Sequence, residues 1–410
     1  MRFSIKAKKI IDGISENIIN DKVIRIVDGH IDEIVDHKNF SPRENEKVYE
    51  FFDETIMPGM IDVHVHLAYS GITQKRAFRA ESADLDYTEQ ALRGYSFALE
   101  HMKYGFTSLR DMNAPGRVAI SIRNLIDSNN LIGPTIKACG LGLSVTGGHM
   151  DQPGWGSHTF FKDMTYPCDG PNEFRKGVRT QFKLGADFIK TNICVSSIYD
   201  PNKPYRQEMT DEEIETVCYE AKLLNLKVAS HTSGGRGITV GVKNGLHTVE
   251  HGHWLDDETI ELMAQKGTFY VPTLLVNEIS SEMSKEDMGT SKNALNWLKM
   301  AQEAKWISLS KAINSNIKIA VGTDAGFMLP HGSLNHKEMM LLKKGGLSNF
   351  EVIKSATQIG AELLGINAGI LKPGREADIL IIKGNPLDDL SVLSDKSNIT
   401  VFKKGQLIKN

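Results

Sequence analysis

Four histidines and one aspartate stand at positions where their side chains could bind metal. His64 and His66 are two residues apart in the apolar segment IDVHVHL, and this spacing places both imidazoles on one face of a strand. Neutral imidazoles are common ligands of zinc and related cations. His231, His251 and Asp324 each come near the end of a later apolar segment. Together these residues predict one metal centre rather than separate core histidines.

Lys190, in DFIKTN, lies at the end of another such segment. An ammonium beside divalent cations is repelled and has no lone pair to offer a metal. The neutral amine, however, reacts with carbon dioxide to give a carbamate, an anion whose two oxygens can bridge two metals. A structural lysine in a salt bridge is the alternative that the residue alone leaves open.

The elements that must position these residues follow a βα pattern. From residue 58 onward, apolar strand segments alternate with amphipathic helices, which is typical of an α/β protein with a parallel sheet. In a (β/α)8 TIM-like barrel the carboxyl ends of all strands share one mouth, where active sites lie. The eight predicted strands are 61–67, 105–111, 135–143, 186–193, 227–233, 246–252, 268–275 and 317–324.

Both ends of the chain have a different, antiparallel pattern. Asp28-Gly29 separates two alternating segments as a hairpin turn would, and short strands return after about residue 367. We therefore predict a small β-sandwich domain formed by both termini, 1–57 and 367–410, beside a metal-binding barrel at 58–366.

Local signals refine this outline. Thr210 and Glu213 predict a capping box at the start of a helix, and Gly267 predicts the end of the helix that begins near Asp256. The polar segment 280–291 predicts a mobile loop or lid.

Composition narrows the class of partner. Among 410 residues, 48 Lys and Arg against 51 Asp and Glu leave a net charge of −3, so no basic field favours nucleic acid or an anionic membrane. The four cysteines form no CxxC pair, which argues against a thiolate zinc site or a disulfide framework. No apolar run approaches the ~20 residues of a membrane span. We expect a cytoplasmic protein, a small-molecule substrate and a homo-oligomer.

The motifs resemble those of the metal-dependent amidohydrolase superfamily. PGMIDVHVHL, ADFIK, VASHTS, TVEHGH and VGTDAG occur in the expected order and at the expected strand ends. GFTSLRDM, SVTGGHMDQPG and SATQIGAELLGI are similar to the branch that contains imidazolonepropionase-related proteins and prolidase-like (Xaa-Pro) and Xaa-Arg dipeptidases.

The resemblance implies a centre of two divalent metals, usually zinc. His64, His66 and Asp324 would bind the more buried metal, His231 and His251 the other, and carboxylated Lys190 both. Two such cations lower the pKa of a shared water toward about 7, and Asp324 would act as the catalytic base. The expected reaction is hydrolysis of a carbon–nitrogen (amide) bond in a small molecule, dipeptide or N-acyl amino acid.

The sequence gives weaker signals for substrate-binding residues than for metal ligands. His149, in TGGHMD, resembles a histidine that lies near substrate in this branch. Several prolidase-like relatives hold a terminal carboxylate with a tyrosine and an arginine, but Ser233 and Val240 stand at those positions here. Arg236 is the candidate for the missing positive charge.

Further polar residues have less defined roles. His253, His331 and His336 are candidates for the rim of the site, and Arg110 with Asp111 is predicted to form an ion pair below it.

Two alternatives stay open from the sequence. The same metals would serve a hydrolase of cyclic amides, ureas or aryl amides, or a deaminase of a heterocycle, because each reaction attacks an sp² carbon. A non-catalytic scaffold is disfavoured, since all six expected metal ligands are present. Release of ammonia rather than an amine or amino acid would identify a deaminase.

Overall fold

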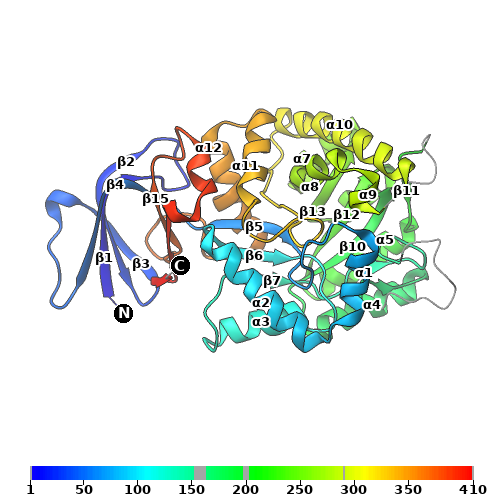
Figure 1. The fold of residues 1–410 in the computed structure, drawn as a ribbon, viewed down its shortest axis with the longest axis horizontal. Helices are drawn as coiled ribbons and strands as arrows, with labels where there is room; N and C mark the ends of the chain where they lie inside the picture. The colour runs from blue at the N-terminus through cyan, green and yellow to red at the C-terminus, as the bar shows by residue number, and fades with distance from the viewer. Residues whose placement is uncertain (1, 152–162, 197–202, 290, 409–410) are drawn as a thin grey trace.

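The computed structural model describes residues 2–151, 163–196, 203–289 and 291–408. Figure 1 shows a β-sheet that contains both chain ends beside a larger body of helices around strands. The α/β barrel with a small sheet built from both termini is thus confirmed.

The terminal sheet has seven strands in the order β17-β16-β15-β4-β1-β2-β3. Asp28 (φ 46°) and Gly29 (φ 81°) form the predicted turn between β2 and β3. Phe3 and Phe402 stack at 5.6 Å between ring centroids although their strands are not neighbours, so the sheet curls over a common apolar core. The strands are β1 (Arg2–Ile10), β2 (Ile19–Val27), β3 (His30–Asp36), β4 (Lys47–Pro58), β15 (Ile379–Lys383), β16 (Ile399–Lys403) and β17 (Gln406–Ile408).

The barrel is a ring of parallel segments. Neighbouring strands pair within β5-β6-β7 and within β10-β12-β13-β14, and the amide of Asp187 donates to Ala138 O at 2.8 Å to join the two runs. The strands are β5 (Met60–Val65), β6 (Phe106–Asp111), β7 (Thr135–Ala138), β10 (Phe188–Ser196), β12 (Lys227–Gly234), β13 (Thr248–Trp254) and β14 (Phe269–Val271).

The eighth segment closes the ring without forming a regular strand. It is held by single bridges at Ile319 and Ala325, and the amide of Asp324 donates to His64 O at 2.8 Å. Short strands lie beside the ring at β8 (Leu143–Ser144), β9 (Tyr166–Pro167) and β11 (Tyr205–Gln207).

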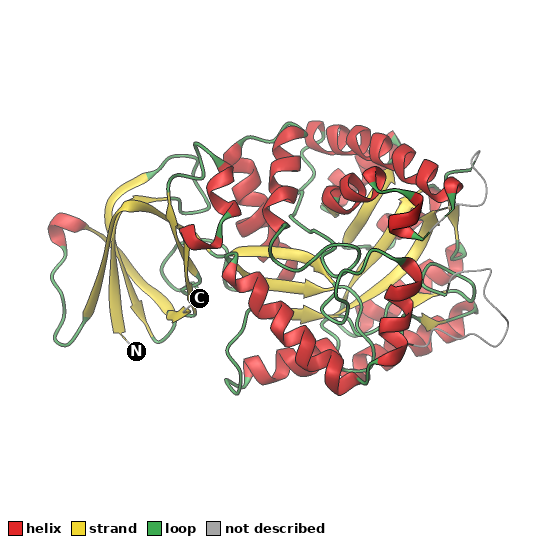
Figure 2. Cartoon of the chain, in the orientation of Figure 1, coloured by secondary structure: helices red, strands yellow, loops and turns green. Residues whose placement is uncertain are grey.

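Helices surround these strands (Figure 2). The predicted capping box is present: Thr210 Oγ1 accepts from the amide of Glu213, whose carboxylate accepts from the amide of Thr210. The first helices are α1 (Lys75–Asp84), α2 (Tyr87–Lys103), α3 (Val118–Asp127), α4 (Gly170–Leu184), α5 (Asp211–Leu223), α6 (Arg236–Lys243) and α7 (Asp257–Lys266). They are followed by α8 (Leu274–Glu282), α9 (Lys285–Met288), α10 (Lys292–Asn314), α11 (Asn335–Lys344), α12 (Asn349–Lys354) and α13 (Gly360–Leu364).

Three local predictions are corrected. The predicted strand 268–275 ends at Val271, because the chain turns at Thr273 (φ 47°) and Leu274 begins α8. The predicted strand 135–143 is divided where Gly140 (φ 71°) bends the chain between β7 and β8. The predicted loop 280–291 instead contains the end of α8 and all of α9.

Within the described ranges, no helix has both the length and the apolar content needed to cross a bilayer.

Candidate metal centre

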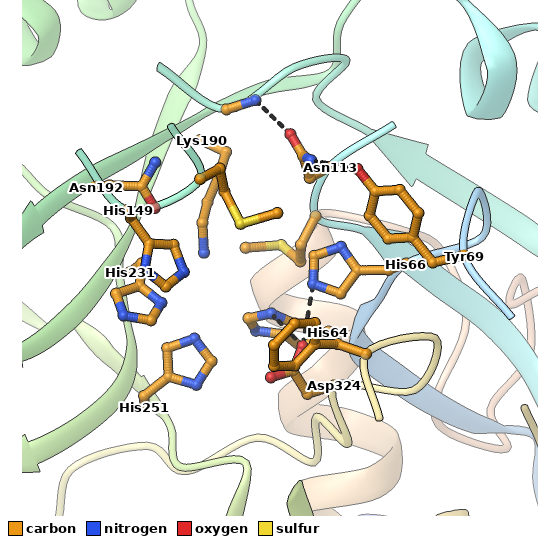
Figure 3. Close-up of a pocket in the computed structure, with 14 residues that line it drawn as sticks. His64, His66, Tyr69, Asn113, His149, Lys190, Asn192, His231, His251 and Asp324 are labelled. Atoms are coloured by element: carbon orange, nitrogen blue, oxygen red, sulfur yellow. Dashed lines mark hydrogen bonds and ion pairs between the residues drawn. The ribbon is translucent and has the colours of Figure 1, made fainter. Parts of the chain in front are cut away.

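The carboxyl ends of the barrel strands bring the predicted ligands into one cavity of about 550 Å³ (Figure 3). β5 contributes His64, and His66 follows directly after the end of that strand; β10, β12 and β13 contribute one residue each, and the closing segment the last. The six residues are His64, His66, Lys190, His231, His251 and Asp324.

His64, His66 and Asp324 form the tightest group, and one ligand atom from each lies within 4.8 Å of the others. Asp324 Oδ1 is 3.0 Å from His66 Nε2 and 3.4 Å from His64 Nε2. Burial opposes ionisation of Asp324, but the neighbouring His64 and His66 lower its pKa to about 2. Two imidazole nitrogens and an ionised carboxylate are a donor set that suits a divalent cation.

Glu250 orients this group from below. Its Oε2 accepts from His64 Nδ1 at 2.8 Å, so His64 turns Nε2 toward the cavity. Burial lowers the pKa of His64 to about 4, which keeps the ring neutral and able to bind metal. Glu250 also accepts from Arg110 Nη2 at 2.7 Å, and this ion pair replaces the predicted pairing of Arg110 with Asp111. Successive residues of a strand point to opposite faces, and Asp111 accepts from the amide of Leu67 instead.

A second buried carboxylate ties β5 to the closing segment. Asp62 accepts from Thr323 Oγ1 and Asn335 Nδ2, each at 2.7 Å, and from the amide of His64 at 3.1 Å. Sequence reasoning missed both Asp62 and Glu250. A signal existed for Asp62, since it stands two residues before His64 on the same strand face.

His231 and His251 form the second group, with ring centroids 4.4 Å apart. The centroids of His64 and His251 are 5.0 Å apart, which joins the two groups. Burial lowers the pKa of both His231 and His251 well below its usual value. Both imidazoles are therefore neutral, and each has a nitrogen lone pair that could bind a metal.

A buried polar network supports this second group. His251 Nδ1 lies 2.7 Å from Thr273 Oγ1, which leaves Nε2 for the cavity. Lys305, fully buried, donates from Nζ to Thr273 O at 3.0 Å and also to Asn277 Oδ1. Glu338 accepts from the amides that follow Thr273. This network, also missed from the sequence, holds Thr273 in its left-handed conformation.

Lys190 is 5% exposed and points into the cavity that the histidines line (Figure 3). Its Nζ makes no hydrogen bond or ion pair with another residue of the described ranges. Burial lowers its pKa to about 8. An unpaired buried ammonium is costly, so the position fits a lysine whose amine has been converted to another group.

The two predicted substrate contacts lie in different places. His149 lines the cavity, and its ring stacks on that of His231 at 3.8 Å between centroids. Arg236 lies outside: its side chain is 71% exposed and pairs with Asp211 at 2.6 Å. Gly235 (φ 100°) turns the chain into α6 and directs this first helical residue toward solvent.

The three histidines predicted at the rim of the site lie in different parts of the structure. His331 is buried, 3.0 Å from His101 Nε2 through its Nδ1, and serves packing rather than the rim. His336 is only half-buried, on α11. His253 lines a second cavity that adjoins the first.

Comparisons with known proteins agree on one family. The profile described as the Amidohydrolase family matches residues 55–408. Ochratoxinase from Aspergillus niger is 29% identical over 420 residues, covering 96% of this chain and 82% of that enzyme. The crystal structure of that ochratoxinase has a TM-score of 0.85 at 25% identity and covers 100% of this chain and 95% of its own. A crystal structure of a Xaa-Pro dipeptidase with bound methionine in the active site has a TM-score of 0.88 at 32% identity, with 100% of both chains covered.

Proposed function

The chain belongs to the amidohydrolase family and is a hydrolase of carbon–nitrogen bonds, and we propose that it cleaves the amide bond of a dipeptide or N-acyl amino acid. The observation that carries the proposal is the cavity in which His64, His66 and Asp324 meet Lys190 and a second histidine pair. The likeness to a Xaa-Pro dipeptidase over the full chain supports a dipeptide or a similar small amide.

We assign this cavity two divalent metal ions, with zinc as the expected metal. His64, His66 and Asp324 would hold one ion, His231 and His251 the other, and Lys190, as a carbamate, both. Divalent ions held there would lower the pKa of water and polarise the substrate carbonyl.

Asp324 is the residue placed to move the proton. Its carboxylate lies in the cavity and is ionised at neutral pH. It would accept a proton from the water that attacks the carbonyl carbon and deliver that proton to the departing nitrogen. A carbon–oxygen bond forms, the carbon–nitrogen bond breaks, and the products are a carboxylic acid and an amine. His149, on the wall beside His231, would contact the carbonyl or carboxylate of the substrate.

Substitution of Lys190 tests this proposal. We expect Lys190→Ala to lower bound metal below two equivalents and to lower kcat at least about 100-fold. A short carboxylic acid should restore part of both by replacing the carbamate. Lys222→Ala, which changes an exposed lysine on α5, is the control. Wild-type metal content and activity in Lys190→Ala would contradict the assignment, and release of ammonia in place of an amine would favour a deaminase.

A further inference from the structure

A second cavity of about 730 Å³ adjoins the metal cavity. The two share part of their walls, including His231, His251 and Asp324. Cavities of roughly 300–1,000 Å³ accommodate small-molecule ligands. A group bound in the second cavity would therefore be part of a molecule whose scissile bond lies at the candidate metal ligands.

The wall of this second cavity away from the histidines is apolar. It is built by α8, α9 and α10, together with the residues that follow the closing segment of the barrel. Apart from Asp324 at the metal end, the described lining contains no Lys, Arg, Asp or Glu. The apolar lining residues are Val276, Met288, Ala294, Trp297, Leu298, Phe327 and Met328.

Two polar side chains of this wall already have partners within the protein. Trp297 Nε1 donates to Pro204 O, so the indole offers its ring rather than its N–H. Asn277 Oδ1 accepts from Lys305 Nζ and lies 3.2 Å from His253 Nε2. The ring of Trp297 also packs 5.2 Å from that of His253, which fixes its orientation.

We propose that this second cavity binds an uncharged aromatic or large aliphatic group on one side of the scissile amide. This inference rests on the proposed function and specifies its substrate class. A carboxylate or ammonium bound there would lose its water without gaining a partner of opposite charge, so acidic and basic side chains are rejected. Arg236 does not relieve this shortage, because it faces solvent on α6.

Matched dipeptides test the proposal with the metal-loaded full chain. One residue is alanine and the other is Phe, Leu, Glu or Lys, in both orders. In one order we expect kcat/KM for the Phe and Leu peptides to exceed that for the Glu and Lys peptides by about 100-fold. Equal values, or a preference for charge in both orders, would overturn the proposal.

A binding measurement separates this inference from the proposed function. Calorimetry with N-acetylphenylalanine and N-acetylglutamate compares two ligands that share a carboxylate and differ in the side chain. Tighter binding of the phenylalanine derivative supports the apolar cavity even if no peptide is cleaved, in which case only the proposed function fails. Equal binding of the two rejects the cavity assignment.

A charge placed in the cavity gives the second test. Leu298→Lys should lower kcat/KM for the Phe peptide at least about 10-fold and raise it for the Glu peptide. Met300→Lys, on the same helix but at a 40% exposed position, is the matched control and should change neither value. If Leu298→Lys does not fold, Trp297→Ala should lower the ratio of Phe to Glu turnover. An unchanged ratio in a folded variant would overturn the proposal.

Discussion

The two histidine groups of the candidate metal centre are supported by opposite kinds of neighbour. The His64 ring donates to the carboxylate of Glu250, and the backbone amide of His64 donates to Asp62. His251 instead contacts the hydroxyl of Thr273, behind which lies the amine of Lys305. A carboxylate behind an imidazole raises its basicity as a ligand, whereas a hydroxyl backed by an amine does not.

The two proposed metal positions are therefore not equivalent. The group of His64, His66 and Asp324 carries the ionised carboxylate and the stronger support, so it should bind the first equivalent of metal more tightly. The group of His231 and His251 has neutral imidazoles only and would depend on Lys190 to complete a metal position. Substitutions that affect one or the other histidine group should therefore change metal affinity and activity to different extents.

The largest effect is expected for Asp324→Asn. This variant removes a ligand of the tighter position and the proposed base together, so kcat should fall by at least about 1,000-fold. Metal analysis should show less than the wild-type content. Asp257→Asn, which changes an exposed partner of Lys311, should leave both values unchanged. A variant at Asp324 that keeps a tenth of the activity would show that the two positions do not differ as proposed.

Glu250→Gln tests the support of the tighter position without removing a ligand. The amide still accepts from His64 but no longer carries charge, so we expect about 10–100-fold weaker metal affinity. Arg110 would also lose its buried partner, which should destabilise the fold by about 3–5 kcal/mol. Metal titration and thermal unfolding measure the two effects. Glu258→Gln, at an exposed ion pair with Lys243, is the control, and an unchanged affinity in Glu250→Gln would refute the role of the carboxylate.

The candidate ligands could be predicted because each stands at the end of an apolar strand segment, which a local pattern reports. Their supporting residues could not. Glu250 meets His64 across 186 positions, and this contact exists only once the barrel closes. Lys305 gave no signal either, because a lysine on a long helix is normally exposed. Its burial follows from the packing of α10 against α8 and β13.

The errors in the predicted fold have the same cause, because a local pattern does not report long-range contacts. The apolar run 268–275 is compatible with either a strand or a buried helix. In the structure β14 ends at Val271, and nothing in the local sequence indicates that end. Strand β4 escaped prediction because none of its first eight residues is buried and three of them are acidic, so they show no regular apolar alternation. It lies between β1 and β15 and so joins the two ends of the chain in one sheet. Its role depends on the return of the C-terminal segment, which no local pattern encodes.

Lys305→Met should have a smaller effect, confined to the second position. The apolar side chain fills the space but leaves Thr273 O and Asn277 Oδ1 without their donor. We expect affinity for one of two metals to fall about 10-fold while the other is retained. Titration with cobalt, followed by its absorption, distinguishes the two equivalents. Lys311→Met, on the same helix with a 35% exposed side chain, is the control. Equal weakening of both equivalents would show that Lys305 supports the barrel as a whole.

The smallest effect is expected for Arg236→Met, because Arg236 lies outside both histidine groups. The guanidinium pairs with Asp211 at the surface and lines neither cavity that contains the histidines. The KM for a peptide with a free carboxylate should therefore stay within about twofold of the wild-type value, because a solvent-exposed ion pair contributes little and has no contact with substrate. A KM raised 10-fold or more would place a substrate carboxylate on α6, and recognition would then extend beyond the two cavities.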